Sequence, residues 1–182
     1  MNFKDELLQN LITIEQKWID SVLATYSSDG ARFFKKEKDQ FANPLGYNVE
    51  KGLGKTLRLL VDDQLTELPT EMEQFVKLRA VQTFGASEAV AFVFSLKKIV
   101  IEVCGVKCIA ACAKDWSIFD GRIDDLAMRV FDLYVEDRER LSQIKINEYR
   151  RGNHIMAGTR CPSTLMKKNK EEKIELKAIQ DS

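Results

Sequence analysis

The sequence predicts an all-α domain of about six helices followed by a charged tail, and three observations support this prediction. Apolar residues recur every three or four positions through most of residues 5–151, which is the spacing of one buried helix face. Only three Pro and nine Gly occur in 182 residues, so few turns are obligatory. Hydrophobic residues make up 45% of the chain, enough for a core, and no segment shows the alternation of a half-buried strand.

The first half of the chain predicts three helices separated by turns. The first spans residues 5–26 and ends at the Ser-Ser-Asp-Gly turn of residues 27–30. A short second helix spans residues 31–41. The Asn-Pro-Leu-Gly turn of residues 43–46 follows, because proline fixes its own φ and pushes the preceding residue out of the helical region. A third helix spans residues 48–65.

Two further helices are predicted before residue 102. Thr70 and Glu73 fit a capping box at the start of the fourth, which spans residues 70–84. Ser87 is expected to cap the fifth, which runs through residue 101 and is apolar on most of its circumference, so we expect it at the centre of the domain. The aromatic residues of this region are expected in the core: Phe84, Phe92 and Phe94.

The last long helix is predicted to begin near Ser117 and to continue to Arg151. Residues 152–182 lack helical periodicity and contain Gly, Pro and a Lys/Glu-rich run, so we expect a flexible tail. The predicted organisation is therefore a helical domain over residues 1–151 and a charged tail over residues 152–182. A tail of this kind is either solvated or a docking arm for an acidic partner or an anionic membrane surface.

Charge and hydropathy exclude several classes of protein. Basic and acidic side chains balance at 28 each, which argues against nucleic-acid binding. The N-terminus is acidic and amphipathic and lacks the features of a secretory signal. The most apolar stretch, residues 89–101, contains two lysines and is too short to span a bilayer. We therefore expect a cytoplasmic protein that is not integral to a membrane.

Several segments resemble a known family. Residues 43–47 (NPLGY) and 51–53 (KGL) resemble a joint in the N-terminal domain of RsbT co-antagonist proteins of the RsbR/RsbRD type. Residues 79–98 (RAVQTFGASEAVAFVFSLKK) are similar to the most recognisable run of that family, and residues 131–134 (FDLY) and 146–151 (INEYRR) resemble its final helix. The resemblance spans residues 8 to 151. It implies a globin-like helical sensor domain that binds no haem and precedes a STAS domain in stress-signalling assemblies.

The chain departs from the family plan where a STAS domain would follow, since only residues 152–182 remain there. We therefore expect a stand-alone sensor or adaptor rather than a direct component of the stressosome. Such a domain would have no enzymatic activity and no cofactor. We expect it to form a homodimer through its first or last long helix and to act on a regulatory protein partner, responding to a ligand or partner by a shift in helix packing.

Candidate binding or sensing residues flank the joint between the fourth and fifth helices: Arg79, Gln82, Ser87, Glu88 and Phe92. A buried arginine needs acceptors, so Arg79 is expected to organise a polar network, with Glu88 as one candidate partner. These residues either hold the joint together or sense a ligand or partner, and the sequence leaves both alternatives open.

Cys104, Cys108 and Cys112 are spaced four residues apart and would share one face of a continuous helix. A row of thiols fits a redox-sensitive or metal-responsive site, and this is the alternative function. However, structural zinc sites need four ligands, and Cys161 is the only other thiol. We expect no metal, because small buried cysteines in helix contacts are commoner.

Two other patterns are weaker. Residues 52–56 (GLGKT) resemble part of a phosphate-binding loop, but Val49 stands where that pattern needs glycine, and no strand precedes it. We favour a helix surface whose small residues allow close packing. The single histidine, His154, falls at the edge of the tail, so haem ligation and histidine-dependent catalysis have no support.

Overall fold

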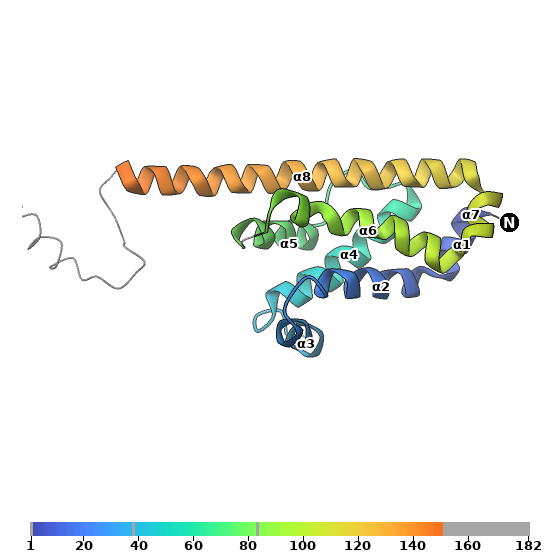
Figure 1. The fold of residues 1–182 in the computed structure, drawn as a ribbon, viewed down its shortest axis with the longest axis horizontal. Helices are drawn as coiled ribbons and strands as arrows, with labels where there is room; N and C mark the ends of the chain where they lie inside the picture. Colours follow the sequence, from blue (N-terminus) through green and yellow to red (C-terminus); the bar gives the residue numbers. More distant parts are fainter. Residues whose placement is uncertain (1, 38, 83, 151–182) are drawn as a thin grey trace, which may run out of the picture. The chain divides into compact units, whose positions relative to one another are not determined.

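The computed structural model describes residues 2–37, 39–82 and 84–150, and every regular element in these ranges is an α-helix, which confirms the predicted all-α class, with eight described helices where about six were expected. The helices described are α1 (Phe3–Gln9), α2 (Leu11–Leu23), α3 (Ser28–Lys36), α4 (Pro44–Asp62), α5 (Thr70–Val81), α6 (Ala86–Cys104), α7 (Val106–Ala111) and α8 (Ala113–Arg150) (Figure 1). None of the helices in these ranges carries an apolar stretch that would reach across a lipid bilayer. The predicted tail lies outside the described residues.

The chain divides into two compact units, residues 1–142 and residues 143–182. In the second unit the structure describes residues 143–150, which are helical and exposed, and the Gln143 side chain donates a hydrogen bond to Asn147 Oδ1 at 3.3 Å. All packing described below belongs to the first unit.

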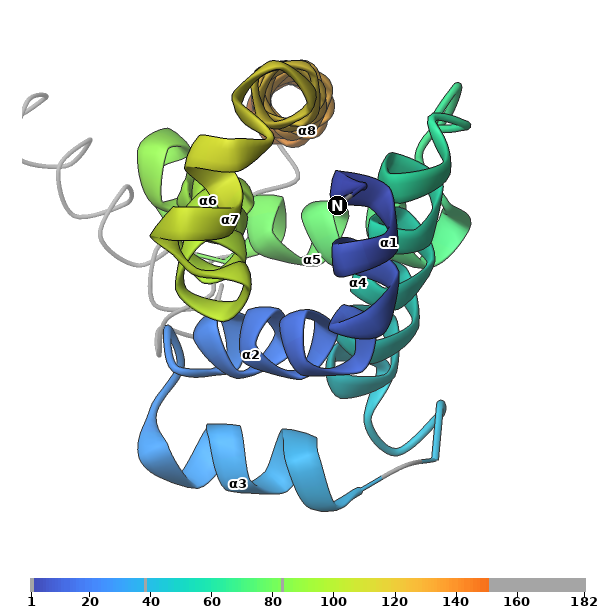
Figure 2. The ribbon, with the colours of Figure 1, turned by 90° about the vertical axis from the view of Figure 1, so that its right-hand side faces the viewer.

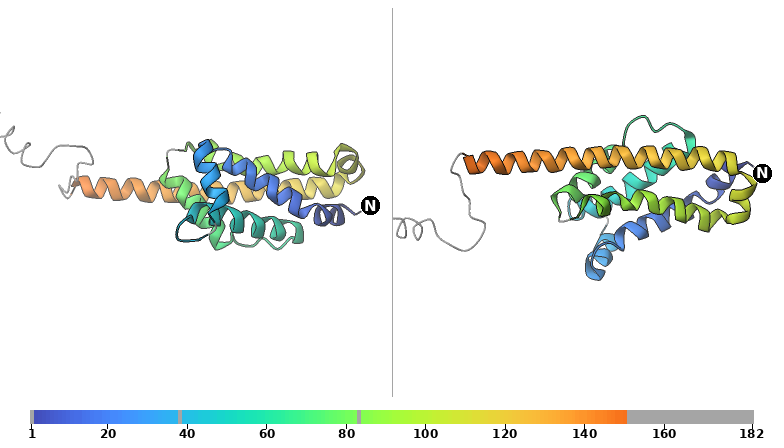
Figure 3. Two further views of the ribbon diagram at one scale, coloured as in Figure 1. Left: turned by 90° about the horizontal axis from the view of Figure 1, so that it is seen from below. Right: turned by 45° about the horizontal axis from the view of Figure 1, so that its top comes forward.

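Within the first unit the helices pack around one hydrophobic core. Viewed along α8 in Figure 2, α6 and α7 lie on one side of the core, α1 and α4 lie on the other, and α2 lies opposite α8. Helices α6 and α8 run side by side (Figures 1 and 3), and Lys97 of α6 pairs with Asp120 and Asp124 of α8 at 2.9 and 2.8 Å. Helix α3 lies outside α2 and buries none of its side chains.

The predicted first helix, residues 5–26, is divided at Asn10 into α1 and α2. The Asn10 side-chain amide donates to the carbonyl and the carboxylate of Glu6, at 3.0 and 3.1 Å. An asparagine that bonds the backbone in this way competes with helix continuation, which explains the break. Helix α2 then buries Trp18, whose indole N–H donates to the Phe92 carbonyl at 2.8 Å.

Helix α4 begins at Pro44, four residues earlier than predicted. The Asn43 side-chain oxygen accepts from the Gly46 N–H at 2.9 Å and caps the helix. Pro44 occupies the first turn, where its missing N–H is not needed. The Asn-Pro turn is therefore a helix start.

The same Asn43 also holds α3 against α4. Its side-chain amide donates to the Phe34 and Glu37 carbonyls at 2.9 and 2.7 Å, and α3 ends at Lys36, short of the predicted residue 41. A Cβ atom at Gly46 would lie 2.5 Å from the Phe34 oxygen. Glycine is the residue that fits at this contact.

Residues 52–56 lie inside α4, and their small residues allow close packing as predicted. A Cβ atom at Gly52 would lie 2.8 Å from the Met72 nitrogen on α5, and one at Gly54 would lie 2.5 Å from Oε1 of Glu15 on α2. The two glycines therefore let the backbone of α4 approach both neighbouring helices. The segment is part of a regular helix, not a phosphate-binding loop.

Three predicted helix caps are wrong. Helix α5 starts with Thr70 inside it and without a side-chain cap, α6 contains Ser87, and α8 begins four residues before Ser117. A serine or threonine marks the start of a helix only approximately, because the residues that precede it can also adopt helical conformation. Helix α5 also stops at Val81 rather than Phe84.

Helix α6 packs in the core as predicted, with Val93, Leu96 and Val100 fully buried. Phe92 is also buried, and Phe84 is half-buried against the core. The prediction for Phe94 is wrong, since 46% of this residue is exposed. Residues two apart on a helix point to different faces, so Phe92 and Phe94 cannot both face the core.

Candidate functional site at the joint between α5 and α6

Arg79 lies at the end of α5 and is completely buried. Its Nη1 donates to the Glu88 carbonyl at 3.0 Å, and its Nη2 donates to the Thr25 hydroxyl at 2.8 Å. Its Nε has no hydrogen-bond partner among the residues that the structure describes. The predicted network around Arg79 is therefore present, but its acceptors are a main-chain carbonyl and a hydroxyl, whereas the expected Glu88 carboxylate points elsewhere.

Four aromatic rings surround the guanidinium of Arg79. Its central carbon lies 5.7 Å from the ring centroid of Tyr26, 5.0 Å from Phe75, 4.6 Å from Phe84 and 5.3 Å from Phe92. Desolvated cation–π contacts contribute about 2 kcal/mol or more each. They compensate for the lack of a carboxylate, since none in the described ranges forms an ion pair with this guanidinium. We call Arg79 and these four residues the aromatic cage.

Burial and mutual proximity shift the ionisation of two cage residues. Desolvation lowers the pKa of the Arg79 guanidinium, and Tyr26 partly offsets this effect. An arginine remains charged despite such a shift, because its ordinary pKa is very high. Burial raises the pKa of the Tyr26 hydroxyl, which Arg79 partly opposes. The cage therefore holds a permanent buried cation beside a protonated phenol.

The α5–α6 joint, residues 82–85, is held by the predicted residues Gln82 and Glu88. The Tyr26 hydroxyl donates to Gln82 Oε1 at 3.2 Å, and Glu88 Oε2 accepts from the Gly85 N–H at 2.9 Å. Ser87 is exposed on the first turn of α6. The structure therefore brings Arg79, Gln82, Glu88 and Phe92 into one site and leaves Ser87 on its outside.

Helix α8 is attached to the other helices by side chains that donate to main-chain carbonyls. The pairs are Arg122 with Leu60, Arg129 with Thr66, Tyr134 with Phe84 and Arg138 with Ala80. Tyr134 donates to the Phe84 carbonyl in the α5–α6 joint at 2.6 Å. Arg138 donates to the Ala80 carbonyl near the end of α5 at 3.1 Å. Arg122 and Arg138 thereby satisfy carbonyls near the C-terminal ends of α4 and α5, which is a common role for arginine beside a helix end. Tyr134 thus bonds the joint itself to α8, while Arg138 bonds the end of α5 and Arg79 bonds the start of α6.

Sequence reasoning missed several residues of the site: Thr25, Tyr26, Phe75, Tyr134 and Arg138. Tyr134 lies in the FDLY segment, which marked it as part of the final helix but gave no partner. Phe75 precedes Arg79 by four residues on α5, a spacing that places both side chains on one face and could have indicated this contact. The remaining contacts join residues far apart in the chain, such as Thr25 with Arg79. No local spacing encodes such pairs.

The three cysteines do not lie on one continuous helix. Cys104 ends α6, Gly105 adopts φ +82°, Cys108 lies in α7 and Cys112 follows α7 as its cap. All three are free thiols. Burial raises the pKa of Cys104 to about 11 and also raises the pKa of Cys108, so these thiols are protonated at neutral pH.

Metal binding has no support in the part of the chain that the structure describes. Within residues 2–37, 39–82 and 84–150, no three His, Cys, Asp or Glu side chains gather in a way that would hold a metal ion. His154 and Cys161 lie outside these ranges.

Comparison with known proteins identifies the family. No curated protein and no solved structure has significant similarity to this chain. Residues 13–148 match the sequence profile of the RsbT co-antagonist protein rsbRD N-terminal domain. The match contains the Asn-Pro helix start, the aromatic cage and the donors of α8, and it covers most of the chain. The chain therefore belongs to the family of RsbT co-antagonist rsbRD N-terminal domains.

Proposed function

We propose that this chain is a non-enzymatic sensor or adaptor domain in bacterial signalling, and that its response is a change of packing at the α5–α6 joint. Its family consists of regulatory domains rather than enzymes. One observation carries the proposal: Phe84 of the joint contacts the buried Arg79 through its ring and Tyr134 of α8 through its carbonyl. Arg79 also bonds the start of α6, and Arg138 of α8 bonds the end of α5. A movement of the joint therefore displaces the acceptors that hold α8.

We infer that the side chains of the aromatic cage can pack in two alternative arrangements, because the guanidinium depends on several separate groups. A buried guanidinium without a carboxylate depends on its rings, one carbonyl and one hydroxyl. A ligand or partner that moves one of these groups changes the free energy of the whole cage. A modest difference in affinity for two such arrangements is sufficient to shift their populations.

The proposed partners are a second copy of the chain and a regulatory protein, and the proposed location is the cytoplasm. Exposed apolar side chains on neighbouring helices support a dimer through α8: Phe94, Met128 and Phe131 are 46%, 61% and 41% exposed. Light scattering of the full chain tests the dimer. A monomer at all concentrations, or a dimer unaffected by Met128→Ser with Phe131→Ser, would contradict contact through this face.

Hydrogen exchange tests the proposed coupling between the cage and α8. We expect Arg79→Met to accelerate amide exchange in residues 80–89 and also in residues 126–138 of α8, while the centre of α4 stays protected. Arg58→Met is the matched control, because Arg58 forms an exposed ion pair with Glu15. Unchanged exchange in residues 126–138 of a folded Arg79→Met protein would rule out coupling between the aromatic cage and α8.

A further inference from the structure

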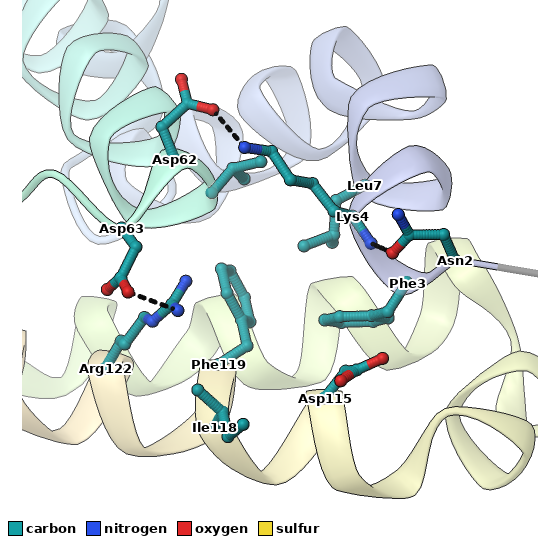
Figure 4. Close-up of a pocket in the computed structure, with 11 residues that line it drawn as sticks. Asn2, Phe3, Lys4, Leu7, Asp62, Asp63, Asp115, Ile118, Phe119 and Arg122 are labelled. Carbon is teal, nitrogen blue, oxygen red and sulfur yellow. Dashed lines mark hydrogen bonds and ion pairs between the residues drawn. The ribbon is translucent and has the colours of Figure 1, made fainter.

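A second region has the shape of a small ligand site and is separate from the joint. Residues of α1, the end of α4 and the start of α8 line an open cup of about 240 Å³. We call it the N-terminal cup; its lining includes Phe3, Lys4, Asp62, Asp115, Phe119 and Arg122 (Figure 4). The volume lies just below the roughly 300 Å³ at which sites for drug-sized ligands begin. The occupant it suits is therefore a small molecule.

The floor of the cup is aromatic and aliphatic. Phe3 and Phe119 meet edge to face with ring centroids 5.8 Å apart, and Leu7 lies beside them. Trp116 packs against both rings, at 6.1 Å from Phe3 and 6.4 Å from Phe119. Phe3 and Phe119 are only 3% and 2% exposed, so the apolar surface open to a ligand is chiefly that of Ile118, which is 50% exposed. Trp116 offers a spectroscopic probe next to the cup.

The charges around the rim are not balanced. Lys4 is paired with Asp62 at 2.8 Å, and Arg122 is paired with Asp63 at 2.9 Å (Figure 4). The fifth charged side chain, Asp115, is exposed and forms no ion pair with another described residue. Three carboxylates therefore face two cations, and the group without a partner is negative.

We propose that the N-terminal cup binds a small organic amine, with its ammonium group at Asp115 and its apolar body against Ile118. An anion is disfavoured, because Asp62 and Asp63 already neutralise Lys4 and Arg122 and the rim carries one negative charge more than it has positive ones. A bare metal ion fits poorly, because Asp115 and Asp62 lie on opposite sides of the cup and the described residues contain no cluster of three metal ligands.

Titration of the full chain with 2-phenylethylamine tests this assignment. The chain has two tryptophans, so the indole N–H signals in a ¹⁵N–¹H spectrum report separately on Trp116 and on the deeply buried Trp18. We expect the Trp116 signal to move saturably, with a Kd of about 1 mM, and the Trp18 signal to stay in place. No movement of the Trp116 signal up to about 20 mM amine would overturn the proposal.

One uncharged analogue, one negatively charged analogue and three variants complete the test. We expect 2-phenylethanol, 3-phenylpropionate and the Asp115→Asn variant each to weaken binding about fivefold, the factor expected for one exposed ion pair. Ile118→Ser, at the half-exposed lip of the cup, should weaken it as well. Asp125→Asn is the matched control, since Asp125 lies on the same helix but does not line the cup. Equal binding of the alcohol, or full binding by folded Asp115→Asn, would overturn the assignment without affecting the proposal for the joint.

Discussion

The guanidinium of Arg79 lies 4.6 Å from the centre of the Phe84 ring, while the carbonyl of the same Phe84 accepts a hydrogen bond from Tyr134 of α8. One residue of the α5–α6 joint therefore contacts a buried cation through its ring and the last long helix through its backbone. A displacement of Phe84 alters both contacts together. The following predictions test this relationship and the packing around it.

Replacing Arg79 by alanine should destabilise the domain by about 3 kcal/mol, because the substitution leaves a cavity among four rings and strands the Thr25 hydroxyl and Glu88 carbonyl. The melting temperature should fall by about 6–12 °C. Arg58→Ala is the control and should cost less than about 1 kcal/mol, since half of the Arg58 side chain is exposed. A melting temperature within a degree or two of the parent would refute the role of Arg79.

Tyr134→Phe removes only the hydroxyl that donates to the Phe84 carbonyl at 2.6 Å. We expect a loss of about 1–2 kcal/mol in urea unfolding, since the carbonyl would remain partly buried without its donor. Tyr47→Phe is the matched control on α4 and should change stability by less than about 0.5 kcal/mol. Equal stabilities for the two variants would show that the Tyr134 bond contributes nothing.

Two Gly→Ala substitutions should act in opposite directions. Gly52→Ala places a Cβ atom 2.8 Å from the Met72 nitrogen, so α4 and α5 must separate, at a cost of about 1–3 kcal/mol. Gly121→Ala lies inside α8 with no atom within 4 Å of the new Cβ, so better helix propensity should stabilise the chain by about 0.5–1 kcal/mol. Chemical denaturation measures both, and the same sign for both would contradict the packing described here.

The ion pair between Glu71 and Lys55 should make stability depend on pH. The hydrogen bond from Lys55, at 2.5 Å, lowers the pKa of the Glu71 carboxyl in the folded state. A depressed folded pKa stabilises the protein above the unfolded pKa of about 4.3, and this contribution is lost as the pH falls through the folded pKa. Lys55 is largely exposed, so the contribution is below about 1 kcal/mol.

Urea titrations of the parent and Lys55→Met between neutral and acidic pH measure this contribution. We expect the two stability curves to converge as Glu71 becomes protonated. A constant separation at all pH values would assign the effect of Lys55 to packing rather than to charge.

The buried thiols should react slowly. With a pKa of about 11, about one Cys104 side chain in a thousand is a thiolate at pH 8. In a Cys161→Ser variant, the remaining cysteines should therefore react with a disulfide reagent far more slowly in the folded protein than in urea. Rapid reaction in the folded state at neutral pH would revive the redox alternative.

The amino-acid sequence by itself predicted the helical class, because apolar periodicity is a local property that survives in any packed arrangement. It also predicted a polar network around Arg79, which the hydrogen bonds from Arg79 to Glu88 and Thr25 confirm. That prediction rested on the need of a buried arginine for acceptors, whereas the aromatic residues nearby were assigned to the core. The Gly-rich segment of α4 was likewise predicted to pack closely, and the contact at Gly52 bears this out.

Only the tertiary structure decided which groups meet. Arg79 bonds a carbonyl on α6 and a hydroxyl after α2, and α8 is held by donors to main-chain carbonyls. Every residue carries such a carbonyl, so no residue type marks the one that will be used. The helix break at Asn10 was missed for a related reason. A helix ends where side-chain hydrogen bonds to the backbone outweigh helix propensity, as the Asn10 amide does by donating to the Glu6 carbonyl.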